Sequence, residues 1–346
     1  MMNYENAENT FEYIRSKMME VEAELKKTII GIDGVLHLIT IALFSRGHVL
    51  LEGVPGVGKT ALCRCLSKAV KGGFARIQGV PDLLPRDAVI IEDIDAETGR
   101  YVFKPGPLIS QGEKLAIVLL DEINRIHPKG QAGFLEVMQE RTITAFGQQY
   151  KLPHVIFVAT RNSVEKGETE ELPHAQRDRF LMEIDVPYLS AEYEKELMRN
   201  PKFEDMGRLI EGVAPIIETE EITEFWDWIG KNISVSPAIL DYIYNIVDAS
   251  RHPSSYGINL GGADENDKDI IMAGISPRGE IMIRRASQTA AVLRGSKSVL
   301  PQDLHEILVP TMAHRIFFQP SALRRRSKIA EEFLLQIKNK VAPYER

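Results

Sequence analysis

The sequence holds little cysteine and no long apolar run, and both shortages narrow the class of protein. Its 346 residues include two cysteines, Cys63 and Cys65, and a disulfide between residues so close in the chain is strained. We therefore exclude a scaffold held together by disulfides and expect a reducing compartment. The longest apolar stretches, such as Leu115–Leu120 and Val155–Ala159, are far shorter than the roughly 20 residues that a membrane-spanning helix needs.

An excess of positive charge is missing as well. The chain has 42 Lys and Arg against 49 Asp and Glu, a net charge of −7. This balance argues against wholesale coating of nucleic acid, although one basic groove stays compatible with it. The opening residues, MMNYENAENT, lack the basic and then apolar pattern of a signal peptide. We therefore expect a cytoplasmic protein that does not insert into membranes.

What the chain does contain is an alternation of short apolar runs and amphipathic segments before residue 187. The expected strands are His48–Leu51, Ala116–Leu120, Val155–Ala159 and Phe180–Val186, and the expected helices are Phe11–Lys27, Val35–Ser45, Thr60–Val70 and Gly130–Glu140. Short apolar strands with helices between them predict an α/β fold, in which a parallel sheet is covered on both faces.

The pattern changes after Pro187. Helices and loops alone are expected there, with helices at Ala191–Arg199, Ile222–Lys231, Pro237–Ser250, Arg278–Leu293, Pro301–Val309 and Ser321–Asn339. Residues 253–274 are rich in Gly, Ser, Asn and Asp, so we expect a long exposed loop. Two domains are predicted, an α/β domain over residues 1–188, N-terminal helix included, and an all-helical domain over residues 189–346.

A glycine-rich motif lies between the first expected strand and the helix after it. Its residues Gly53, Val54, Pro55, Gly56, Val57, Gly58, Lys59 and Thr60 fit the phosphate-binding pattern G-x-x-x-x-G-K-[ST]. Glycines let backbone N–H groups approach phosphate oxygens, and the following helix adds the positive end of its dipole. We expect this loop and Ala61 to bind a nucleotide, with Lys59 reaching the β- and γ-phosphates and the Thr60 hydroxyl binding Mg²⁺.

Two adjacent carboxylates end another expected strand, because Leu115–Leu120 runs directly into Asp121 and Glu122. In a phosphate-loop ATPase such residues have defined tasks: Asp121 would hold Mg²⁺ through water, and Glu122 would orient and deprotonate the attacking water. Strands often end in charge, so the pair is informative only together with the glycine-rich loop. Both features together predict an ATPase whose cofactors are ATP and Mg²⁺.

Six segments follow one another in an order that matches a known family. They are GVPGVGKT, RIQGVPDLLPRD, VFKPGPLIS, LLDEINRIHPKGQAGFLEVMQERTIT, FVATRNS and LPHAQRDRF. The series resembles the MoxR family of AAA+ ATPases, and the resemblance extends from about Ile29 to Arg315. It implies a phosphate-loop AAA+ core followed by an all-α lid domain.

The resemblance implies roles for two polar residues that follow expected elements. Asn162 matches the family's sensor 1, which helps position the hydrolytic water; a turn at a strand end is the alternative. Arg161 and Ser163 depart from the family's usual ATQNP on either side of it. Arg278, in the sequence SPR, matches sensor 2, which touches the γ-phosphate from the lid.

The same resemblance points to residues at a subunit interface and at the nucleotide base. Arg179, in the sequence DRF, matches an arginine finger that acts across the interface of a ring, and Arg177 is the other candidate. A solvated helix charge is the alternative for either arginine. Ile30 and Gly31 match a segment that lines the adenine pocket, and a plain turn between helices is the alternative there.

Two further segments resemble insertions that one clade of these ATPases shares. Residues 86–107 indicate a small β excursion, and Arg141–Pro153 indicates a hairpin around Gly147; the two segments resemble the helix-2 insert and the hairpin before sensor 1. Both insertions occur in MoxR-like proteins, magnesium chelatase ATPase subunits and MCM-type helicases. In ring ATPases such hairpins face the central pore or the partner, and a purely structural hairpin is the alternative.

The resemblance finally implies a function. MoxR-like proteins form homo-oligomeric rings, here expected to be hexamers, and hydrolyse ATP between subunits to remodel, activate or assemble protein partners in a chaperone-like manner. Their partners typically carry a von Willebrand factor A domain. The alternatives are a nucleic-acid motor of the MCM kind, which the negative net charge disfavours, and a nucleotide-dependent scaffold that does not hydrolyse ATP.

Overall fold

A computed structural model of the protein describes residues 7–94, 98–145, 147–162, 172–258, 270–319 and 326–343. The chain forms two compact units. The sheet unit comprises Lys17–Arg179 and Ile184–Glu224, and the helical unit comprises Met1–Ser16, Phe180–Glu183 and Phe225–Arg346. The domain boundary expected after residue 188 stays a prediction, and residues 189–224 belong to the sheet unit.

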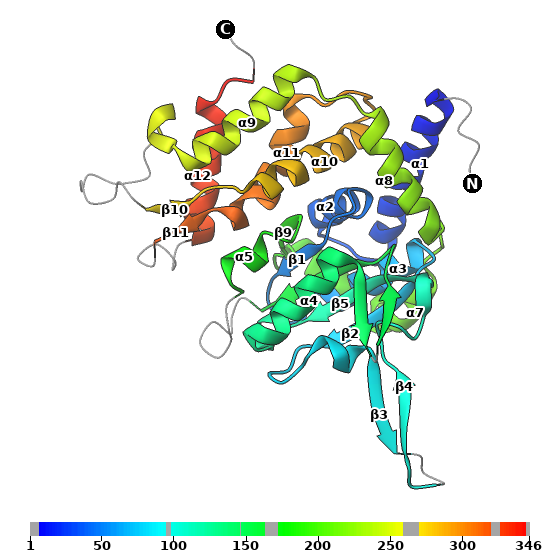
Figure 1. Ribbon diagram of the computed structural model, residues 1–346. Coiled ribbons are helices and arrows are strands. Elements are labelled where there is room, and N and C mark those ends of the chain that lie inside the picture. The colour runs from blue at the N-terminus through cyan, green and yellow to red at the C-terminus, as the bar shows by residue number, and fades with distance from the viewer. Residues whose placement is uncertain are drawn as a thin grey trace. The chain divides into compact units, whose positions relative to one another are not determined.

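A five-stranded sheet forms the centre of the sheet unit, in the order β2-β5-β8-β1-β9 (Figure 1). Its strands are β1 (Val49–Glu52), β2 (Gly73–Gln78), β5 (Leu115–Asp121), β8 (Ile156–Arg161) and β9 (Met182–Asp185). Strands β2, β5, β8 and β1 pair in parallel with their neighbours. Every residue of β5 is buried, as in a strand that is covered on both faces. The predicted α/β class is confirmed.

Helices precede the strands of this sheet, connect them and follow the last one. They are α2 (Asp33–Phe44), α3 (Lys59–Ala69), α4 (Pro128–Glu140), α5 (His174–Arg177), α6 (Ala191–Arg199) and α7 (Met206–Glu211), while α1 (Ala7–Thr28) and α8 (Thr219–Asn232) contribute to both units. Short 3₁₀ turns lie at Pro85–Ala88, Gly112–Lys114, Ile123–Arg125 and Pro201–Glu204. The sequence does not predict β2 or α7. Strand β2 lies at the sheet edge and alternates buried with exposed residues, so it has no apolar run to mark it.

The predicted β excursion and the predicted hairpin are both antiparallel strand pairs in the sheet unit. Strands β3 (Ile90–Ile94) and β4 (Tyr101–Pro105) pair antiparallel, as do β6 (Thr142–Ala145) and β7 (Gln148–Lys151). Gly147, with φ of +75°, lies in the turn between β6 and β7, where glycine is favoured because it has no Cβ to clash. These two predictions are therefore confirmed, whereas the roles of the segments stay predictions.

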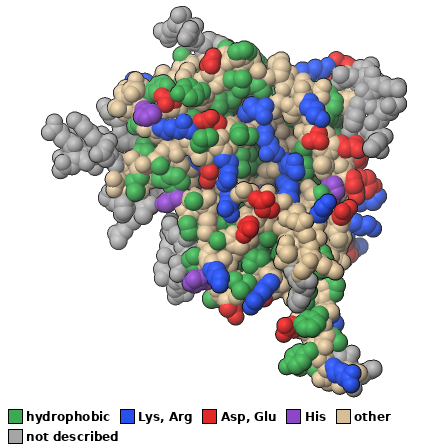
Figure 2. Space-filling view, in the orientation of Figure 1, with side chains coloured by type: hydrophobic (Ala, Val, Ile, Leu, Met, Phe, Trp, Pro, Cys, Tyr) green, Lys and Arg blue, Asp and Glu red, His purple; other side chains and the backbone are tan. Residues whose placement is uncertain are grey.

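The β3–β4 ribbon carries exposed apolar side chains on one face. Ile94 pairs with Tyr101, and Phe103 pairs with Glu92, so these residues share a face. Ile94, Tyr101 and Phe103 are exposed by 58%, 73% and 60%. In Figure 1 the ribbon projects from the sheet, and Figure 2 shows apolar side chains gathered along it.

The helical unit is built mainly from α9 (Pro237–Arg251), α10 (Pro277–Arg294), α11 (Pro301–Met312) and α12 (Arg326–Lys340). Helix α10 packs against α9 and α11 (Figure 1). Two of these helices begin with a serine cap followed by proline at the first helical position: the hydroxyls of Ser236 and Ser276 accept from the N–H groups of Ile239 and Gly279. This pattern satisfies backbone donors that a helix start leaves unpaired.

An ion pair joins α10 to α11. The Arg294 guanidinium donates through Nε to Asp303 Oδ1 at 2.6 Å and through Nη2 to Oδ2 at 2.9 Å. The Asp303 carboxylate is 1% exposed and also accepts from the backbone N–H of Leu300 at 2.7 Å. This pairing raises the pKa of Arg294, and the carboxylate therefore anchors the start of α11 to the end of α10.

The prediction of helices and loops alone after Pro187 is wrong in one respect. Strand β10 (Ile271–Ala273) pairs antiparallel with β11 (Phe317–Phe318). The expected loop over residues 253–274 thus contains a 3₁₀ turn at Pro253–Tyr256 and a strand, while residues 259–269 lie outside the described part. Strands of two or three residues are too short to show an alternation of apolar and polar residues, and their pairing partners lie far along the chain. Among the described helices, none has the length and hydropathy of a membrane span.

Candidate nucleotide-binding site

The glycine-rich loop joins β1 to α3 in the sheet unit. Gly56 and Gly58 have φ of +84° and +85°, a backbone region that costs glycine almost nothing. A Cβ on Gly53 would lie 2.7 Å from the carbonyl oxygen of Val186. The loop therefore needs glycine for its conformation at two positions and for space at a third, and it delivers the chain to the N-terminus of α3 at Lys59.

Lys59 folds back over this loop. Its Nζ donates to the carbonyl oxygens of Gly53 at 2.5 Å and Val54 at 3.1 Å. Burial lowers the pKa of Lys59, while the negative charges of Asp121 and Glu122 act in the opposite direction. A half-buried ammonium that lies over a phosphate-binding loop is suited to bind the negative charge of a polyphosphate.

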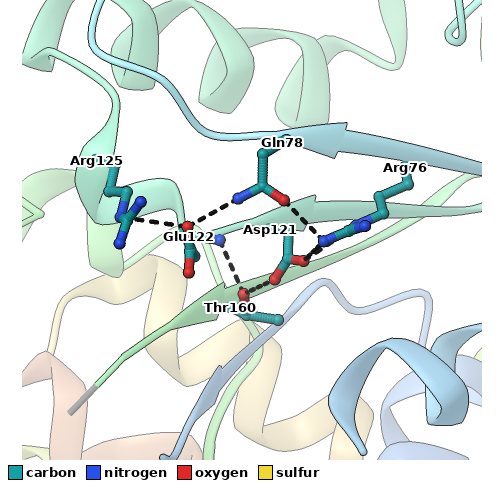
Figure 3. Close-up of polar contacts among 6 residues, drawn as sticks. All are labelled: Arg76, Gln78, Asp121, Glu122, Arg125 and Thr160. Atoms are coloured by element: carbon teal, nitrogen blue, oxygen red, sulfur yellow. Dashed lines mark hydrogen bonds and ion pairs between the residues drawn. The ribbon is translucent and has the colours of Figure 1, made fainter. Parts of the chain in front are cut away.

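The carboxylate of Asp121, the last residue of β5, is held on both oxygens (Figure 3). Oδ1 accepts from the Thr160 hydroxyl at 2.6 Å, and Oδ2 accepts from Arg76 through Nη2 at 2.7 Å and Nε at 3.1 Å. Thr160 comes from β8 and Arg76 from β2, the two strands that flank β5. The neighbouring strands therefore fix the orientation of this carboxylate.

Glu122 follows directly and has the left-handed φ of +55°. Its backbone N–H donates to the Thr160 hydroxyl at 2.9 Å. Its Oε2 accepts from Gln78 Nε2 at 2.8 Å and pairs with Arg125 Nε at 3.2 Å. Figure 3 shows the two carboxylates side by side, with Thr160 bonded to both residues. The arrangement presents two differently held carboxylates at one edge of the sheet.

Four residues of this network have no role that the sequence alone predicts: Arg76, Gln78, Arg125 and Thr160. The first two belong to β2, and their contacts follow from the register that places Gln78 beside Asp121. The available signal was the Arg-x-Gln pattern in RIQ, quoted for the family resemblance, and a threonine near the end of a buried strand.

Asn162 lies directly after β8 and is 6% exposed. Because β5 and β8 are parallel neighbours, this places Asn162 at the same sheet edge as Asp121. The departure at Arg161 has a structural partner, since its guanidinium pairs with Glu52 at the end of β1. Ser163 lies outside the described residues.

The three arginines of the sequence prediction differ in their surroundings. Arg177, in α5, is 2% exposed. Arg179 is only partly buried, and its Nε has no hydrogen-bond partner among the described residues. Arg278 lies in the first turn of α10, in the helical unit, and its role as sensor 2 stays a prediction. Because Arg177 is buried and Arg179 only partly so, Arg179 is the better candidate for contact with another subunit.

Gly31 lies in the turn between α1 and α2 with φ of +79°. A Cβ there would lie 2.8 Å from Tyr193 Cγ and 2.9 Å from Leu189 Cδ2, so the chain around the start of α6 packs directly on this glycine. Ile30 is only partly buried. The adenine contacts of Ile30 and Gly31 stay predictions, and Tyr193 is an aromatic neighbour that the sequence did not indicate.

The donor groups suit Mg²⁺. Thr60 offers a hydroxyl and Asp121 a carboxylate, both of them hard oxygen ligands. Within the described part of the chain, no group of three or more His, Cys, Asp or Glu side chains is placed to hold a metal ion. Mg²⁺ normally binds through one or two protein oxygens together with substrate phosphates and water, so the residues present fit a metal that arrives with a nucleotide.

Comparisons with known proteins agree with this geometry. The family model for the ATPase family associated with various cellular activities (AAA) matches residues 48–182, and that for the AAA lid domain matches residues 264–333. The model for the MoxR domain in the MoxR-vWA-beta-propeller ternary systems matches residues 16–77. Together these matches cover the sheet, its glycine-rich loop and much of the helical unit.

Individual relatives match nearly the whole chain. Protein MoxR of Paracoccus denitrificans is 39% identical over 316 residues, which are 91% of this chain and 92% of the relative. Chaperone MoxR1 of Mycobacterium tuberculosis is 37% identical over 87% of this chain and 75% of its own. The crystal structure of a protein from Cytophaga hutchinsonii matches with a TM-score of 0.83 and 32% identity, and covers 98% of both chains.

Proposed function

This chain belongs to the MoxR family of AAA ATPases, and from that premise we propose that it hydrolyses ATP with Mg²⁺ at the subunit interfaces of a homo-oligomeric ring. The cycle would remodel, activate or assemble a protein partner. The observation that carries the proposal is that the Thr160 hydroxyl bonds to both Asp121 and Glu122 at the C-terminal end of β5.

Nucleotide binding falls to the glycine-rich loop. Its backbone N–H groups and the N-terminus of α3 face phosphate oxygens, and the Lys59 ammonium exchanges its carbonyl partners for the β- and γ-phosphates. Thr60 would bind Mg²⁺ through its hydroxyl and Asp121 would hold the ion through water, and the metal would supply positive charge to the phosphates. Ile30, Gly31 and Ala61 would complete the nucleotide contacts.

Hydrolysis needs a group that takes a proton from the attacking water. Glu122 is suited to this role because its carboxylate is partly exposed and is oriented by Gln78 and Arg125. Asn162, at the same edge, helps to orient the water, and Arg278 would contribute from the lid. The Asp121 carboxylate is already engaged on both oxygens, so it is the less available base.

The variant Glu122→Gln tests this assignment. It keeps the shape and the acceptor oxygen but loses the base, so turnover should fall at least a hundredfold, within the usual range for a general base, while ATP still binds. Glu140→Gln is the matched control, because Glu140 is exposed at the end of α4. This variant should hydrolyse ATP at the wild-type rate. Normal turnover by Glu122→Gln would show that Glu122 is not the base.

Arg179 would complete the site of a neighbouring subunit. Arg179→Ala should lose turnover yet bind ATP, and mixing it with Glu122→Gln should restore part of the activity, because a Glu122→Gln subunit can supply Arg179 to the intact site of its neighbour. Arg177→Ala should instead lower the melting temperature, since Arg177 is buried.

The ring itself is tested by size-exclusion chromatography with ATP, where a hexamer is expected. A chain that stays monomeric and fully active would refute the interface mechanism.

The partner proposal rests on resemblance. The match over residues 16–77 to the MoxR domain of MoxR-vWA-beta-propeller systems, and the likeness to a protein named as a chaperone, favour a partner with a von Willebrand factor A domain. The test is the ATPase rate with and without a purified von Willebrand factor A protein encoded beside this chain, where stimulation and co-elution are expected. No change in rate and no co-elution would count against that partner class.

A motor on nucleic acid is less well supported. The guanidinium of Arg141 donates to the carbonyl oxygens of Pro153 and Val155, so it braces the base of the β6–β7 hairpin. Within the described residues of that hairpin, Lys151 is then the remaining basic side chain. A single lysine is a weak contact for a charged strand. ATPase stimulation by single-stranded DNA would reverse this judgement.

A further inference from the structure

Arg76 occupies the Asp121 oxygen that faces β2. Both of its hydrogen bonds to Asp121, from Nη2 at 2.7 Å and from Nε at 3.1 Å, go to Oδ2. The Asp121 side chain is 12% exposed, whereas that of Arg76 is 50% exposed. The carboxylate is therefore fixed and largely enclosed, while its cationic partner reaches it from solvent along the edge strand.

Gln78 holds the guanidinium in this position. Arg76 Nη2 donates to Gln78 Oε1 at 2.7 Å, and Gln78 Nε2 donates to Glu122 Oε2 at 2.8 Å (Figure 3). The amide thus presents its oxygen to the arginine and its nitrogen to the carboxylate. Each contact supports the other, so the Arg76–Asp121 pair belongs to a connected network.

A guanidinium and Mg²⁺ make incompatible demands on one carboxylate. Oδ2 accepts two N–H groups of Arg76 and Oδ1 accepts the Thr160 hydroxyl, so these contacts leave little acceptor capacity on Asp121 for an incoming cation or its water ligand. A positive charge in direct contact with Asp121 also repels a divalent ion, most strongly where the carboxylate is shielded from water. Arg125 adds a second positive charge beside Glu122. Both carboxylates are thus paired with arginines of the protein itself.

We propose that Arg76 competes with Mg²⁺ for the negative charge of Asp121, so that this ion pair weakens metal binding in the nucleotide site. The inference rests on the proposed function, because it takes Asp121 as the residue that holds Mg²⁺. Arg76 has room to leave, since β2 is the edge strand and half of the side chain already faces solvent. It is a positioning residue, and it makes metal binding weaker than Asp121 alone would allow.

The experiment measures binding rather than turnover. The dissociation constant of a fluorescent ADP is determined once in EDTA and once in saturating Mg²⁺. The constant in EDTA divided by the constant in Mg²⁺ reports how much the metal strengthens nucleotide binding. Arg76→Met removes the charge and keeps an apolar stem, so the ratio should rise at least threefold. Arg125→Met is the matched control, because it removes an arginine from Glu122 in the same network, and its ratio should stay within twofold of wild type.

Other variants separate the possible results. Arg76→Lys keeps a charge but loses the second N–H contact, so its ratio should lie between those of wild type and Arg76→Met. An unchanged or lower ratio for Arg76→Met would overturn the proposal, as would an equal rise for Arg125→Met. Asp121→Asn should bring the ratio close to one. If it does not, Asp121 is not the metal residue, and the metal assignment of the proposed function fails instead.

Discussion

The backbone N–H of Glu122 donates a hydrogen bond of 2.9 Å to the hydroxyl of Thr160, which is 1% exposed. The same hydroxyl donates to Asp121 Oδ1 at 2.6 Å. One side chain of β8 thus fixes both the backbone of the proposed base and the carboxylate of the proposed metal residue.

Thr160→Val should impair both stability and catalysis. Valine keeps the shape but leaves Asp121 Oδ1 and the Glu122 N–H without this partner, which costs about 1–3 kcal/mol of unfolding free energy. Turnover should fall at least tenfold, because Glu122 loses its backbone anchor. Thr40→Val is the control, since Thr40 is equally buried and its hydroxyl only donates to the Leu36 carbonyl within α2. It should leave kcat unchanged, and equal kcat values for all three proteins would contradict the assignment.

Nucleotide affinity should fall in alkaline solution earlier than for an ordinary lysine. Burial lowers the pKa of Lys59 below the usual 10.5, and bound phosphate favours the charged form. Affinity is therefore full at neutral pH and declines as pH rises through the lowered pKa. Binding of fluorescent ADP against pH checks this. Lys59→Arg should bind more weakly but without this decline, because arginine stays charged; a parallel decline in the variant would assign the effect to another group.

The two cysteines should be unreactive in the folded protein. Both are free and buried, and burial raises the pKa of Cys65 to about 11 and that of Cys63 further still. Roughly one Cys65 thiol in a thousand is then ionised at pH 8, and the thiolate is the reactive form. Labelling with a thiol reagent should be slow until guanidinium chloride unfolds the chain and exposes both thiols. Rapid labelling of native protein at pH 8 would show that helix α3, which contains both cysteines, opens locally.

Asp303→Asn should destabilise the helical unit. It weakens the bidentate pair with Arg294 and leaves a partly enclosed guanidinium without its counter-charge, which costs about 2–4 kcal/mol after allowance for the exposure of Arg294. Asp248→Asn is the control, because Asp248 pairs with the exposed His252 and should lose less than about 1 kcal/mol. Urea unfolding measures both, and equal losses would contradict the importance of the buried pair.

The sequence predicted those parts of the site that are local in the chain. The glycine-rich loop and the Asp121–Glu122 pair each follow an apolar strand, so a short window contains both the strand and the chemistry. Arg76 and Gln78 were missed because their role depends on the register between β2 and β5, which no local pattern reveals. The burial of Arg177 is likewise a tertiary property, and the sequence alone could not separate it from Arg179.

The fold shows the same division. Buried strands such as β5 and β8 contain a continuous apolar run and were predicted within a residue or two. The edge strand β2 alternates, and β10 and β11 have three and two residues. For such segments the hydrogen bonds of a distant partner decide the conformation, and composition does not.

The backbone at Glu122 sets folding and chemistry against each other. A φ of +55° costs a residue with a long side chain about 1 kcal/mol relative to glycine. A glycine at this point would relieve this strain, but it would also remove the proposed base and its contacts with Gln78 and Arg125. On the proposed function, the strain is the local cost of placing a carboxylate at this position.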